Sequence, residues 1–85
     1  ASLAPVVAGT AGARLEAKGA AVAVHVRGVA RDDRARVLAA ADATAAPWIA
    51  AGALRQLVGA DVHEYLPAAA WNKGDAVRWI AHDIE

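Results

Sequence analysis

Hydrophobic and polar residues alternate strictly along residues 21–27, where valines at every second position are separated by alanine, histidine and arginine. Such alternation is typical of a β-strand with one face in a core and the other exposed. Residues 14–18 alternate in the same way, and Gly19-Ala20 between the two segments suits a tight turn. The sequence therefore predicts a hairpin. Its polar face carries four candidate ligand-binding residues: Glu16, Lys18, His25 and Arg27.

Two further segments predict helices. Residues 31–46 carry apolar side chains three and four positions apart, and Pro47 is expected to end this helix because proline lacks an amide hydrogen. From Asn72, a plausible N-cap with Asp75 in the first turn, another helix is expected to continue to the end of the sequence. Residues 1–12 are interpreted as the frayed end of a helix.

Residues 53–59 and 62–67 predict a third and a fourth strand, the first of them with imperfect alternation. In the fourth strand Glu64 lies on one face, whereas His63 and Tyr65 lie on the other, where His63 is expected to be a packed core histidine. The order ββαββα predicts an α/β fold of the α+β type, a four-stranded antiparallel sheet with helices on one face. The bare face mixes few charges with alanines, which favours a cap-type domain that closes over a ligand.

Composition limits what the chain can do. Its 85 residues suit one domain, and 26 of them are alanine, so Trp48, Trp71 and Trp79 are expected to supply much of the core volume. Nine basic and nine acidic residues cancel, which argues against nucleic acid and anionic membranes as partners. No apolar run approaches about 20 residues, no signal peptide is recognisable, and cysteine is absent, so we expect a cytoplasmic location.

Zinc is the obvious metal to consider in a chain with three histidines. His25, His63 and His82 come from three separate predicted elements and lack the spacing of metal ligands, so no metal site is predicted from them.

Four short motifs follow one another along the predicted elements. They are Glu16-x-Lys18-Gly19, His25-x-Arg27, Gly59 with Val62-x-Glu64-x-x-Pro67, and Asn72-Lys73-Gly74. In this order they resemble the second half of the trehalose-6-phosphate phosphatases of the haloacid dehalogenase superfamily, over residues 14 to about 80. Members of that family close a cap domain over a catalytic core and remove phosphate from a sugar through an aspartyl-phosphate with magnesium.

The resemblance implies a role for each matching residue. Glu16, Lys18 and Glu64 would form hydrogen bonds with the hydroxyls of trehalose 6-phosphate, and Arg27 would belong to the same surface. Lys73 would be the catalytic lysine of the core, which neutralises charge between the phosphate and the nucleophilic aspartate. The partner of the cap would be the catalytic core domain of the same polypeptide.

The nucleophile and magnesium motifs of the family do not occur in this chain. Its only adjacent acids, Asp32 and Asp33, lack the Asp-x-Asp spacing, so the chain alone is predicted to be inactive. The resemblance divides the chain into a lead-in or the end of a preceding helix (1–13), the cap (14–71) and the start of the returning core helix (72–85).

Other interpretations stay open. Val26 stands where the family usually has an aromatic residue, and Leu66 stands where it usually has an arginine, so another sugar phosphate is an alternative substrate. Glu16 and Lys18 could instead form a solvated strand face with Arg27 as a cross-strand partner. A non-enzymatic module that binds a protein through the bare sheet face is a third interpretation.

Overall fold

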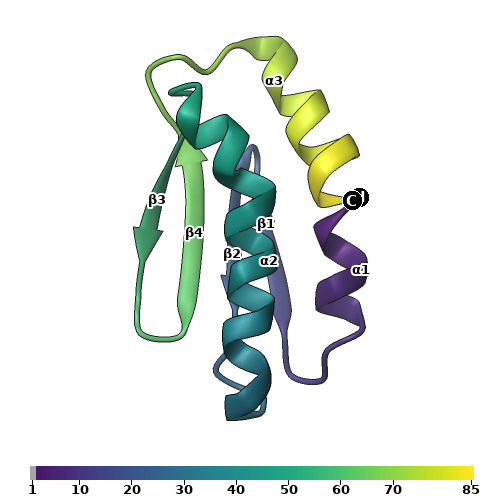
Figure 1. Ribbon diagram of the computed structural model, residues 1–85. Helices are drawn as coiled ribbons and strands as arrows, with labels where there is room; N and C mark the ends of the chain where they lie inside the picture. Colours follow the sequence, from purple (N-terminus) through teal and green to yellow (C-terminus); the bar gives the residue numbers. More distant parts are fainter. Residues whose placement is uncertain (1) are drawn as a thin grey trace.

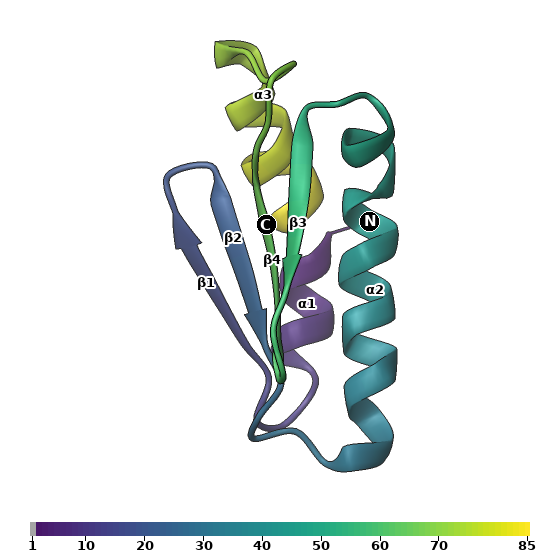
Figure 2. The same ribbon diagram turned by 90° about the vertical axis from the view of Figure 1, so that its left-hand side faces the viewer.

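A computed structural model describes residues 2–85 as an α+β domain in which a four-stranded antiparallel sheet has its helices on one side (Figures 1 and 2). The predicted order ββαββα is confirmed, and the helix interpreted within residues 1–12 precedes it. The elements are α1 (Leu3–Ala8), β1 (Arg14–Lys18), β2 (Ala21–His25), α2 (Arg31–Ala50), β3 (Leu54–Val58), β4 (Val62–Pro67), α3 (Lys73–Val77) and the π-helical segment η1 (Arg78–Ile84).

Strand β2 lies inside the sheet, whose spatial order is β1-β2-β4-β3. Val22 and Val24 of β2 are 1% and 0% exposed, and the register places Leu15 of β1 opposite Val24 on the same core-facing side. Across β4, Tyr65 lies opposite Val22 and His63 opposite Val24, so both face the helices. The side-chain directions predicted for β1, β2 and β4 are therefore confirmed.

The prediction that α2 ends before Pro47 is wrong, because the helix continues through this residue to Ala50. Proline removes one backbone donor, but the last turn is fixed by Trp48, which is 8% exposed. Its indole Nε1 donates a hydrogen bond to Asp83 Oδ2 at 2.6 Å. Contacts with a distant segment thus hold this turn in a helical form that the local sequence does not favour.

The tryptophans fill the centre of the helical layer, as expected. The ring centroid of Trp48 lies 5.7 Å from that of Trp71 and 5.9 Å from that of Trp79, and Trp79 packs edge-on to Tyr65. Fully buried Ala41 and Ala45 line the facing side of α2. Small residues there let the helix approach the sheet closely while large rings fill the space beyond it.

The final helix begins as predicted and then changes its geometry. Asn72 accepts hydrogen bonds from the amides of Gly74 and Asp75, and Asp75 accepts one from the amide of Asn72, which completes a capping box. After five α-helical residues the chain continues as η1, which packs Trp79 and Ile84 into the core.

The two ends of the described chain lie on the same side of the molecule. Helix α1 and segment η1 follow one another along that side (Figure 1). The hydroxyl of Ser2 donates a hydrogen bond to the carbonyl of His82 at 3.3 Å. One hydrophobic core includes Leu3 from α1 and Ile84 from η1 together with the sheet.

A polar cluster attaches α2 to the far half of the sheet. Asp42 Oδ1 accepts hydrogen bonds from the Tyr65 hydroxyl at 2.5 Å, from Gln56 Nε2 at 2.6 Å and from His63 Nδ1 at 2.9 Å. Partial burial raises the pKa of Asp42, but these hydrogen bonds and the charge of His63 outweigh it and leave the pKa below 3.8. Burial and the Asp42 carboxylate raise the pKa of Tyr65.

Replacing Asp42 should therefore destabilise the fold. Asp42→Ala leaves the hydroxyl of Tyr65, a residue with 0% exposure, without its acceptor, which is expected to cost about 1–3 kcal/mol in the free energy of unfolding. Asp42→Asn keeps an acceptor oxygen and should cost less. Urea unfolding at pH 7 measures both variants.

The pH dependence has a defined sign. The pKa of Asp42 is lower in the folded than in the unfolded state. The Asp42 carboxylate therefore adds to the free energy of unfolding at a pH above its unfolded pKa, and this stabilisation is lost as the pH falls through its folded pKa. Wild type should lose more stability than Asp42→Asn between pH 5 and pH 2. Equal urea midpoints for wild type and Asp42→Ala at pH 7 would contradict this role.

Candidate functional site

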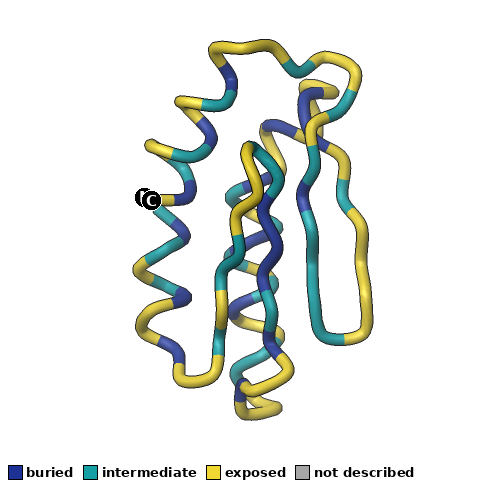
Figure 3. Tube along the Cα trace, turned by 180° about the vertical axis from the view of Figure 1, so that it is seen from behind, coloured by how far each residue is buried: buried dark blue, intermediate teal, exposed yellow. Residues whose placement is uncertain are grey.

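The sheet face away from the helices carries one transverse row of side chains from three strands. Glu16 of β1 lies opposite Ala23 of β2, and Ala23 lies opposite Glu64 of β4. Lys18 lies opposite Ala21 in the neighbouring row. Four of the residues singled out in the sequence, Glu16, Lys18, His25 and Glu64, are therefore together on this face, which we call the open face; Figure 3 views the molecule from this side.

These residues line a shallow hollow of about 140 Å³ on the open face. Ala21 and Ala23 form its floor between Glu16 and Lys18 on one side and Glu64 on the other. Because alanine ends at Cβ, the charged groups rise above the floor and leave space between them. The hollow offers both hydrogen-bond acceptors and a cationic donor to a small polar ligand.

Glu16 already has a partner within the sheet. His25 Nε2 donates a hydrogen bond to Glu16 Oε1 at 3.1 Å. This bond lowers the pKa of Glu16 against the opposing effect of burial, and the charges of Arg14 and Lys18 add to the lowering. His25, one of the four polar residues of the predicted hairpin, thus forms a hydrogen bond within the sheet. The cross-strand partner of Glu16 is His25, whereas the alternative interpretation assigned that role to Arg27.

Arg27 lies just after β2 and outside the Glu16–Glu64 hollow. Its side chain is 88% exposed and its Nε lies 3.7 Å from Asp61 Oδ2. It lines a second, larger hollow at the end of the sheet, and His25 lines both hollows.

Lys73 occupies the first position of α3, in the helical layer. It is exposed and does not line the hollow on the open face. The capping box of Asn72 and Asp75 fixes the backbone on either side of it. The domain therefore holds Lys73 apart from Glu16, Lys18 and Glu64.

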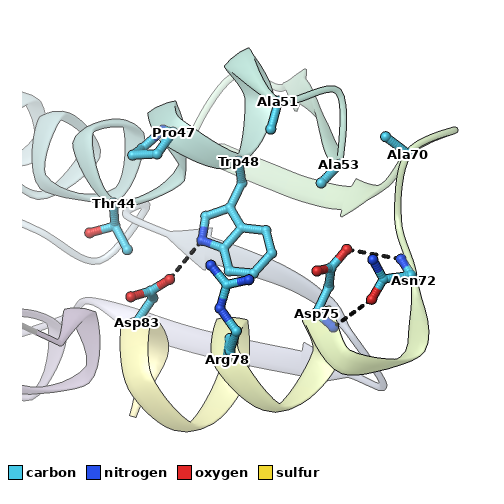
Figure 4. A pocket seen from close by; sticks show the side chains of 10 residues that line it. All are labelled: Thr44, Pro47, Trp48, Ala51, Ala53, Ala70, Asn72, Asp75, Arg78 and Asp83. Carbon is cyan, nitrogen blue, oxygen red and sulfur yellow. Dashed lines mark hydrogen bonds between the residues drawn. The ribbon is translucent and has the colours of Figure 1, made fainter.

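A third hollow, of about 470 Å³, lies between the end of α2 and the α3–η1 segment (Figure 4). Arg78 stacks over the Trp48 ring, with its Cζ 5.0 Å from the ring centroid, and Asp83 accepts a hydrogen bond from the indole nitrogen. The sequence had placed Trp48 in the core but did not indicate these two partners.

Neither a metal centre nor a membrane span emerges from the described chain. Within residues 2–85, no group of three histidine, aspartate or glutamate side chains is arranged to hold a metal ion. No helix in the same range is both long and apolar enough to cross a membrane.

Comparison with known proteins gives a fold likeness. No protein-family profile and no curated protein sequence matches the chain. Among solved structures, a trehalose-6-phosphate phosphatase related protein superposes with a TM-score of 0.62 at 22% sequence identity. The match covers 87% of this chain but 30% of the other, so the chain spans less than a third of the length of that protein. At this identity the likeness establishes a shared fold.

The hydrogen bond between His25 and Glu16 should change the pKa of Glu16 by an amount that can be measured. The pKa of the Glu16 carboxyl should lie below 4.5 in the folded protein, and His25→Ala should move it upward because the donated hydrogen bond is lost. Carboxyl carbon shifts followed by NMR across an acid titration measure both values. His82→Ala, which removes a histidine outside the open face, is the matched control, and an unchanged Glu16 pKa in His25→Ala would contradict this account.

Proposed function

We propose that this chain is the substrate-recognising cap of a trehalose-6-phosphate phosphatase. The observation that carries the proposal is the row formed by Glu16, Ala23 and Glu64, with Lys18 beside it, on an open sheet face. The fold shared with a trehalose-6-phosphate phosphatase related protein supports it.

The chemistry of the hollow suits a sugar. Carboxylates accept hydrogen bonds from hydroxyl groups, and an ammonium group donates to hydroxyl oxygens, so Glu16, Glu64 and Lys18 together can bind neighbouring hydroxyls of a ring. A site built to bond each hydroxyl discriminates strongly against sugars that place one elsewhere, because the unmatched protein group stays unpaired. Arg27, which the resemblance assigned to the same surface, lies outside this hollow beside Asp61, so we assign it no contact with the sugar.

In the complete enzyme the catalytic core would supply the nucleophilic aspartate and the magnesium ligands. The described chain holds no cluster that fits a metal ion, so magnesium would be bound by the core. Lys73 would contact the phosphate there, where a fixed cation stabilises charge on a transferring phosphoryl group. The chain by itself would be inactive.

The positions of the two ends support the role of an inserted cap. Ser2 and His82 are hydrogen-bonded, so the start of α1 and the end of η1 lie on the same side of the domain, where both can connect to a core. In this proposal residues 14–71 form the cap, and residues 1–13 and 72–85 connect it to the core. Closing the cap would exclude water from the reacting phosphate.

One observation favours a related substrate as a second candidate. Leu66, which departs from the family pattern, lies on the open face opposite Arg55, where it can affect sugar choice. Val26, the other departure, is 1% exposed and faces the core, so it has no access to a ligand. If the substrate is a different sugar phosphate, Leu66 is therefore the departure from the family pattern that can account for the changed sugar preference.

Trehalose itself tests the sugar site. Titration of the isotope-labelled chain with trehalose should shift the backbone amides of Glu16, Lys18, Ala23 and Glu64, and Glu64→Gln should weaken binding by about tenfold because one charge-assisted hydrogen bond is weakened. Glu85→Gln makes the same chemical change away from the face and should have no effect. A well-folded chain without shifts on the open face would favour a protein-interaction module instead.

Lys73 and Glu64 should behave differently in the complete enzyme. Lys73→Ala is expected to lower kcat by about a hundredfold on every phosphate ester, because it removes a transition-state contact. Glu64→Ala should reduce turnover of trehalose 6-phosphate and spare a small generic phosphate ester. Steady-state kinetics on both substrates measure this contrast, and near-normal rates in Lys73→Ala would rule out its phosphate role.

A further inference from the structure

A second hollow lies at the end of the sheet where three connections come together, and we call it the basal hollow. It has a volume of about 460 Å³, within the size range of small-molecule sites. Its lining comes from the ends of β1, β2 and β4 and from the loop before β1, the loop after β2 and the turn between β3 and β4. The residues that line it are Gly12, Arg14, His25, Arg27, Gly28, Ala60, Asp61 and Val62.

The charge balance of the basal hollow is positive. Asp61 is the one carboxylate among its described lining residues, and two arginines approach it, Arg34 at 3.6 Å and Arg27 at 3.7 Å. Arg34 is held in place by hydrogen bonds that its guanidinium donates to the carbonyls of Val29 and Arg27. Arg34 therefore neutralises the charge of Asp61, and the positive charge of Arg27 is not balanced by a second carboxylate in the hollow.

Arg14 adds a further positive charge at the opposite side of the hollow. Within residues 2–85 it forms no ion pair at 4.0 Å or less, and the nearest carboxylate on its strand, Glu16, is bonded to His25. Arg27 has 88% of its side chain exposed, so its contact with Asp61 is open to competition. Two guanidinium groups are thus available to one ligand.

The floor of the hollow is kept free of side chains by the backbone itself. Gly12 has φ +86°, and a Cβ there would overlap the carbonyl oxygen of Gly28. A Cβ on Gly28 would in turn lie 3.2 Å from the carbonyl oxygen of Gly12. Because the two loops touch through glycine backbones, no larger residue at Gly12 can fill the space between Arg14 and Arg27.

From these observations we propose that the basal hollow binds a phosphate group through Arg14 and Arg27. Guanidinium groups present paired N–H donors that match the oxygens of phosphate, and a doubly charged anion is best neutralised by more than one cation. The site is separate from the phosphate role of Lys73 and does not depend on the proposed sugar function. Its ligand is either free phosphate or the phosphate of a larger ester.

The test uses inorganic phosphate as the probe with the isotope-labelled 85-residue chain at pH 7. Ionic strength is held constant with chloride, so that general screening does not change during the titration. Saturable shifts are expected at the amides of Gly12, Gly28 and Ala60. The double variant Arg14→Gln with Arg27→Gln should weaken binding by about tenfold or more, because two charge-assisted contacts are lost.

Arg55→Gln is the matched control, since it removes an exposed arginine from β3 at the opposite edge of the sheet. It should leave phosphate affinity unchanged. Tighter binding of a small phosphate ester without a sugar than of inorganic phosphate, read at these three amides, would identify an ester as the source, and equal binding would identify the free anion. No saturable shift at the three amides, or equal affinity in the double variant, would overturn the proposal.

The two ligand sites can fail independently. The double arginine variant should keep the trehalose response of Glu16 and Glu64, and Glu64→Gln should keep the phosphate response of the basal hollow. Loss of the trehalose response alone would contradict the proposed function and leave the phosphate site standing.

Discussion

The alternation of side chains in β2 is the constraint on which the rest of the structure depends. Because β2 pairs with β1 on one side and β4 on the other, its two faces set those of both neighbours. With Val22 and Val24 in the core, Ala23 and His25 must lie on the open face. A shift of one residue would bury His25 and expose the valines, so the need for a core also fixes the polar surface.

Small side chains serve both layers of the domain, for different reasons. On the open face, Ala23 leaves room between two carboxylates that come from the strands beside it. In the helical layer, Ala41 and Ala45 bring α2 close to the sheet, and the volume that they do not fill is supplied by the rings of Trp48 and Trp79. An alanine-rich chain of 85 residues can therefore form a close-packed core, because its few large residues gather in one place.

Local pattern was enough to predict the strands and the facing directions of β1, β2 and β4. The resemblance grouped Glu64 with Glu16 and Lys18, and the pairing of β2 with β4, which brings Glu64 beside the hairpin, was not predicted from local pattern. Features that depend on distant contacts were not predictable in this way. Pro47 lies within α2 because Trp48 is held by Asp83, 35 residues later. Asp42 was overlooked, although a signal existed: His63 and Tyr65 on a core-facing parity require a polar partner from the opposing helix. The basal hollow brings together three loops that are separate in sequence.

His25 gives the two hollows a physical connection. Its ring lines both, and its Nε2 is bonded to Glu16 on the open face. A ligand hydroxyl that takes over Glu16 would remove the hydrogen bond that fixes this ring between the two hollows. An anion that attracts the ring would, conversely, free Glu16 for a hydroxyl. Any such coupling must act equally in both directions, because it is a property of the binding free energies. A molecule that carries hydroxyls and a phosphate at matching distances would use both effects at once.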